Sequence, residues 1–138
     1  MTFRGEVMKI KSINPYTEEV NWVYDSFSFA ECEAKIGKSR AAFSGWSSLP
    51  VEERAKHFTR VSSVLRQNTE IYAEIITKEM GKPIRQSRGE IEKCAWLCDY
   101  YAENAAESLK DEIVDTGAEK SYVTFEPLGI IFGIMPWN

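Results

Sequence analysis

Gly129-Ile-Ile-Phe-Gly-Ile-Met-Pro-Trp-Asn138 closes the sequence, and residues 129–135 form an uninterrupted apolar run. A strand that is half exposed to water alternates apolar and polar residues. A continuous apolar strand is typical of the centre of a parallel sheet that helices cover on both faces. Such a strand needs neighbouring strands, each reached through a crossover of a dozen or more residues. Since no residues follow Asn138 to supply them, we expect an incomplete α/β fold.

The composition excludes several classes of function. The net charge of −4, without a basic stripe, argues against a nucleic-acid partner. The longest stretch free of charged and polar residues, 128–137, is shorter than the roughly 18–20 residues of a membrane span. Residues 1–6 lack the apolar segment of a secretory signal. We therefore predict a cytoplasmic protein without a membrane partner.

The cysteines and the single histidine do not indicate a metal site. Cys32, Cys94 and Cys98 are an odd number without the spacing of a disulfide framework. Cys94 and Cys98 lie one helical turn apart, but zinc usually takes four Cys or His ligands and His57 is distant in sequence. We interpret these cysteines as small apolar residues of helices and predict no bound metal.

The N-terminal part of the chain has the pattern of a β-hairpin. Two strand-like segments, 9–13 and 20–24, flank the turn cluster 14–17, in which Asn-Pro and Thr favour a turn. We interpret residues 1–8 as an N-terminal appendage.

Three helical segments follow, with clear signals at their ends. The capping box Ser28-Phe-Ala-Glu31 begins the first, which should end near Trp46. Pro50 begins the second, and Gly81 ends it. The third should extend from Pro83 to about residue 109.

Apolar periodicity predicts which faces of these helices are buried. In the second segment, Asn68 and Thr69 form a re-cap between two apolar stripes. In the third, steps of 7, 3, 4, 3 and 4 residues describe one helical face. Its members are Ile84, Ile91, Cys94, Cys98, Tyr101 and Ala105.

Beyond Lys110 the pattern changes from helix to strand. Residues 112–114 are short and strand-like, residues 115–117 form a turn, and the β-branched and aromatic residues 121–125 predict a strand. Two partners remain open for this strand. It could pair locally with residues 112–114, or it could add its edge to another sheet.

Three blocks of the sequence, in matching order and spacing, carry a resemblance to a known family. They are Asn14-Pro-Tyr-Thr-Glu-Glu19; Glu79-Met-Gly-Lys-Pro83 with Glu90-Ile91 and Tyr100-Tyr-Ala102; and Glu126-Pro-Leu-Gly129 with Met135-Pro-Trp-Asn138. Together they resemble the N-terminal segment of the aldehyde dehydrogenase superfamily. Residues 79–83 and 97–103 look most like the succinate-semialdehyde dehydrogenase type.

The resemblance implies part of an enzyme that oxidises an aldehyde to a carboxylic acid with NAD or NADP. In that family a cysteine thiolate attacks the aldehyde, hydride passes to the nicotinamide and a glutamate activates water. Asn138 matches the asparagine whose amide helps to hold the oxyanion. Met135, Pro136, Trp137 and Asn138 match a loop that lines the cofactor cleft.

The resemblance also implies a domain organisation. Residues 9–138 would be the N-terminal part of an NAD(P)-binding domain, and residues 112–127 would resemble part of the oligomerisation arm. The expected order is a hairpin, a cluster of long helices, an oligomerisation-type strand and the first strand of the nucleotide-binding fold.

Two departures from the family pattern stand out. Glu18 occupies the position of a usual glycine, which suggests a modified first turn. The family's nucleophilic cysteine, general-base glutamate and most of its cofactor site lie downstream. None of Cys32, Cys94 and Cys98 has the Gly-Gln-x-Cys context of that nucleophile.

We therefore expect this fragment to be inactive alone, to hold no NAD or NADP, and to self-associate through residues 129–135. Two alternatives remain open. The chain could be one half of a split two-chain enzyme, whose partner carries the remaining strands. It could also be a non-catalytic helical oligomerisation module.

Overall fold

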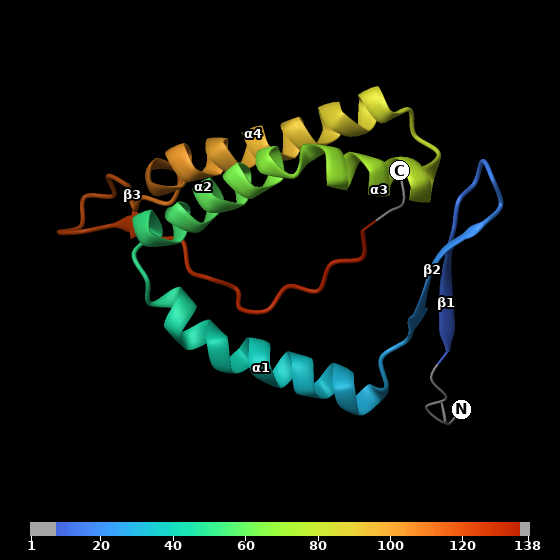
Figure 1. The fold of residues 1–138 in the computed structure, drawn as a ribbon. Coiled ribbons are helices and arrows are strands. Elements are labelled where there is room, and N and C mark those ends of the chain that lie inside the picture. The colour runs from blue at the N-terminus through green and yellow to red at the C-terminus, as the bar shows by residue number, and fades with distance from the viewer. Residues whose placement is uncertain (1–7, 136–138) are drawn as a thin grey trace.

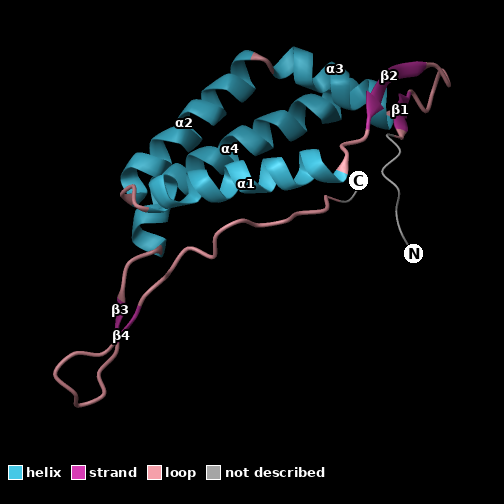
Figure 2. Cartoon of the chain, turned by 90° about the horizontal axis from the view of Figure 1, so that it is seen from below, coloured by secondary structure: helices cyan, strands magenta, loops and turns pink. Residues whose placement is uncertain are grey.

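The computed structural model describes residues 8–135, and its elements follow the order hairpin, helices, short strands and extended segment (Figure 1). The bounds are β1 Lys9–Ile13, β2 Val20–Asp25, α1 Phe29–Ser47, α2 Val51–Gln67, α3 Thr69–Met80, α4 Ile84–Ser108, β3 Glu112–Ile113 and β4 Tyr122–Val123. Helices α2 and α3 follow one another in one direction, and α4 packs against both while running back. After β4 the chain runs back alongside α1 (Figures 1 and 2).

The predicted hairpin is confirmed. Strands β1 and β2 pair antiparallel, with a bulge between Ser12 and Ile13. The Asn14 side chain accepts a hydrogen bond of 2.9 Å from the backbone N–H of Tyr16, which is the local bond that makes asparagine a turn residue. Glu18 has a φ of 61°, in the left-handed region that glycine adopts without strain. The turn therefore holds a glycine-like conformation at the position where the family usually has glycine.

The hairpin is anchored on the end of α3. The Ser12 hydroxyl donates to Glu79 Oε1 at 2.7 Å, and the Asn21 amide donates to the backbone oxygen of Lys78 at 3.0 Å. Helix α3 ends at Gly81, whose φ of 67° closes the helix in the left-handed conformation. A Cβ at Gly81 would lie 2.9 Å from Cγ of Pro15 in the hairpin turn. Gly81 thus serves both the helix end and the docking of the hairpin.

Replacing Gly81 with alanine should therefore destabilise the chain by roughly 1–3 kcal/mol, because the left-handed conformation and the contact with Pro15 both oppose a side chain. Urea denaturation followed by circular dichroism measures the loss. Gly89→Ala is the matched control: Gly89 lies inside α4 with open space around it, so alanine should stabilise by roughly 0.5–1 kcal/mol. Equal effects of the two substitutions would contradict this account.

The helix ends agree with the predicted signals. Ser28 and Glu31 form the capping box: the Glu31 N–H donates to the Ser28 hydroxyl at 3.3 Å, and the Ser28 N–H donates to the Glu31 carboxylate at 2.8 Å. Asn68 separates α2 from α3. Helix α1 contains no buried residue, which fits its position apart from the other helices in Figure 1.

The buried faces of α2–α4 agree only in part with the predicted ones. The buried residues of these helices are Ser62, Ala73, Ser87, Ile91 and Ala95. On α4 the least exposed line follows residues 84, 87, 91, 95, 98, 102 and 105. The predicted face is therefore right at Ile84, Ile91, Cys98 and Ala105, and wrong at Cys94 and Tyr101, which are exposed. Small side chains occupy the contact because they allow two helix axes to approach closely.

Residues beyond α4 form the shortest elements of the fold. β3 pairs antiparallel with β4 through Glu112 opposite Val123 and Ile113 opposite Tyr122. Of the two partners that the sequence left open for this strand, the structure forms the local one. The β3–β4 ribbon projects away from the helices (Figure 2). Within residues 8–135, no helix combines the length and apolar character that crossing a membrane requires.

Candidate functional site

The segment predicted to enter the active site follows β4. Gly129 turns the chain with a φ of 98°, and residues 130–135 continue as an extended segment (Figure 1). The predicted strand over residues 129–135 has no hydrogen-bonded partner in the described part of the chain, where β1–β2 and β3–β4 are the sheets. A strand is stabilised by its neighbours. The segment therefore stays unpaired within residues 8–135.

Both faces of this segment are open to solvent. Ile131 is 71% exposed, Phe132 87% and Ile134 81%, although neighbouring residues of an extended chain point to opposite sides. Gly129 and Ile130 instead line a shallow hollow on α1 together with Phe43 and Trp46. The exposed apolar edge predicted for residues 129–135 is thus present. Apolar side chains on both faces of this segment are typical of a strand that other elements cover on both sides.

The four predicted cofactor-binding residues are only partly described. The Met135 side chain is 81% exposed, and its methyl group lies 2.7 Å from where a Cβ of Gly133 would stand. Pro136, Trp137 and Asn138 lie outside the described residues, so the roles predicted for them stay predictions.

Dinucleotides bind where a strand is followed by a glycine-rich turn and a helix N-terminus that receives the phosphates. Of the residues predicted to line the cofactor cleft, the structure describes Met135, whose side chain lies open to solvent.

The cysteines do not form a nucleophilic centre. Cys32 and Cys94 are exposed on helices, and Cys98 is partly buried. Burial raises the pKa of the Cys98 thiol, and the nearby Cys94 and Asp99 raise it further. A catalytic thiol needs the opposite shift, because the thiolate is the reactive form. In the described part of the chain, no cluster of three His, Cys, Asp or Glu side chains could hold a metal ion.

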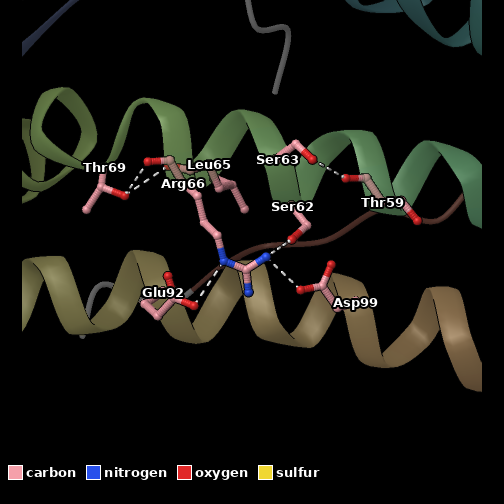
Figure 3. A network of polar contacts seen from close by, with 8 residues as sticks. All are labelled: Thr59, Ser62, Ser63, Leu65, Arg66, Thr69, Glu92 and Asp99. Atoms are coloured by element: carbon pink, nitrogen blue, oxygen red, sulfur yellow. Dashed lines mark hydrogen bonds and ion pairs between the residues drawn. The ribbon is translucent and has the colours of Figure 1, made fainter.

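A polar network that the sequence analysis missed connects α2 to α4 (Figure 3). Arg66 donates through Nε to Glu92 at 3.0 Å and through one η nitrogen to Asp99 at 2.7 Å and Ser62 at 2.6 Å. A second arginine, Arg88 of α4, holds Glu70 of α3 through two nitrogens. The seven-residue spacing of Glu92 and Asp99 places both on one face of α4 and was the available signal.

This network predicts how stability depends on pH. Hydrogen bonds from Ser62 and then Arg66 lower the pKa of Asp99 below its usual value. A carboxylate with a lowered pKa stabilises the fold above its unfolded pKa of about 4 and loses this contribution as the pH falls through the folded value. We expect the free energy of unfolding to fall below about pH 4, and to fall less steeply in Asp99→Asn.

Urea denaturation across this pH range measures the slope. Asp111→Asn, which removes an exposed carboxylate outside the network, should leave the slope unchanged. The same slope in Asp99→Asn and the parent chain would refute the role of the network. Some slope should persist in Asp99→Asn, because Arg88 lowers the pKa of Glu70 in the same direction.

Comparison with known proteins places this arrangement in a family. Residues 3–138 match the model of the aldehyde dehydrogenase family. The chain belongs to that family. This confirms the resemblance drawn from residues 14–19, 79–102 and 126–138.

The relatives of this aldehyde dehydrogenase chain include succinate-semialdehyde dehydrogenases. A probable succinate-semialdehyde dehydrogenase [NADP(+)] of Synechocystis is 37% identical over 131 residues, which are 95% of this chain and 29% of that protein. An Escherichia coli succinate semialdehyde dehydrogenase [NAD(P)+] is 38% identical over 92% of this chain and 28% of its own length. The chain thus spans less than a third of the length of these relatives.

A solved structure agrees with this assignment. The crystal structure of succinic semialdehyde dehydrogenase from Streptococcus pyogenes, in complex with NADP+, superposes with a TM-score of 0.78 at 31% identity. The match covers 83% of this chain and 25% of the other. The hairpin and helices described above therefore have the arrangement of an N-terminal aldehyde dehydrogenase segment, and the predicted incomplete α/β fold is confirmed.

Proposed function

We propose that this chain supplies the N-terminal part of an NAD(P)-dependent aldehyde dehydrogenase of the succinate-semialdehyde type, and that it does not turn over aldehydes alone. The observation that carries the proposal is the match to succinate-semialdehyde dehydrogenases over only 29% of their length. The two open faces of residues 129–135 support it, since further strands and helices would cover them.

Within this proposal each part of the chain has a role. Residues 9–138 contribute the beginning of the cofactor-binding domain, and residues 112–127 contribute to an oligomerisation arm. Met135, Pro136, Trp137 and Asn138 line the cofactor cleft once the rest of the domain is present. The Asn138 amide donates to the oxyanion that forms on the aldehyde carbon, because an amide N–H is a neutral donor that does not titrate.

The chemical step needs groups that these residues do not supply. The chain has no cysteine in a Gly-Gln-x-Cys setting. The one partly buried thiol, Cys98, has a raised pKa. When bound, NAD or NADP supplies the hydride acceptor of the reaction. This chain's own contribution is to position one wall of the cleft.

An assay of the purified 138-residue chain tests the proposal. With succinate semialdehyde and NADP+ we expect no NADPH formation above the uncatalysed rate, and no saturable heat of NADP+ binding in isothermal titration calorimetry. A full-length succinate-semialdehyde dehydrogenase serves as the positive control. Turnover, or one-to-one NADP+ binding in the micromolar range, would overturn the proposed inactivity.

The split-enzyme alternative makes a different prediction for the native source. A second polypeptide that carries the remaining strands and the nucleophilic cysteine would co-purify with this chain and restore NADPH formation. Recovery of the chain without a partner would count against that alternative.

A further inference from the structure

We draw no further inference here: the strongest candidate, the apolar hollow between the first turns of α2 and the last turns of α4 that Trp46, Phe58 and Tyr101 line, is an open face of a chain that spans less than a third of the length of its relatives, and nothing in the structure shows what covers it.

Discussion

Replacing Ile131, Phe132 and Ile134 together with serine should keep the chain monomeric, whereas we expect the parent chain to self-associate through these residues. These side chains are 71%, 87% and 81% exposed and lie on both sides of one extended segment. Burying a large apolar side chain is worth roughly 1.5–3 kcal/mol. Covering three of them in an assembly therefore contributes roughly 4 kcal/mol or more, which is about a thousandfold in an association constant.

Size-exclusion chromatography with light scattering, over a range of protein concentrations, measures this effect. The parent chain should elute as dimers or larger species, and the triple variant should elute as a monomer. The helical circular dichroism of the triple variant should equal that of the parent chain, because the three replaced side chains lie largely in solvent.

A scattered set of equally exposed residues provides the control. Tyr16, Phe29 and Ile113 are 90%, 76% and 87% exposed, but they lie apart, in the β1–β2 turn, at the start of α1 and in β3. Serine at these positions should leave most of the association intact, because they do not form a continuous strand. A monomeric parent chain would show that residues 129–135 do not drive self-association.

Replacing Ile91 with alanine should have the largest effect on the stability of the helical layer. Ile91 is 7% exposed, and it is the one large side chain among the buried residues of α2–α4. Shortening a buried isoleucine to alanine costs roughly 2–5 kcal/mol, through lost transfer energy and the cavity left behind. Since whole domains are stable by only roughly 5–15 kcal/mol, this change should bring the chain close to unfolding.

The measurement is urea denaturation followed by helical circular dichroism. Ile71→Ala in α3 is the matched control, because Ile71 is 59% exposed and its truncation should cost less than roughly 1 kcal/mol. Equal losses for the two variants would mean that the contact between α4 and the helices α2 and α3 is not the centre of stability.

Local chemistry explains which elements could be predicted from sequence. The turn at Asn14, the capping box of Ser28 and the stop at Gly81 each depend on residues a few positions apart, and each lies where it was predicted. The face of α4 was predicted in part: Ile84, Ile91, Cys98 and Ala105 lie on it, and Cys94 and Tyr101 do not. Apolar periodicity missed Ser87 and Ala95, which are small residues at the closest helix contact.

The candidate site also has features that the sequence predicts and features that only the structure shows. Blocks of residues in matching order and spacing, such as Glu79–Pro83 and Glu126–Gly129, were enough to predict the aldehyde dehydrogenase family, and the family match confirms it. The bonds from Arg66 to Glu92 and Asp99 cross 26 and 33 residues. Among the described residues, the buried Nε of Arg54 has no hydrogen-bond partner, which sequence alone does not reveal.

The apolar run at residues 129–135 shows both what the sequence determines and what only the tertiary structure decides. Its composition alone predicts a strand covered on two faces, because backbone alternation and hydrophobicity are properties of the segment itself. Whether that strand pairs depends on hydrogen-bond partners from other strands, and residues 8–135 form none for it. The hydrophobic pattern is a property of neighbouring residues and can be found in the sequence. Strand pairing and helix contact bring together groups that are far apart in sequence, so only the tertiary structure shows which groups pair.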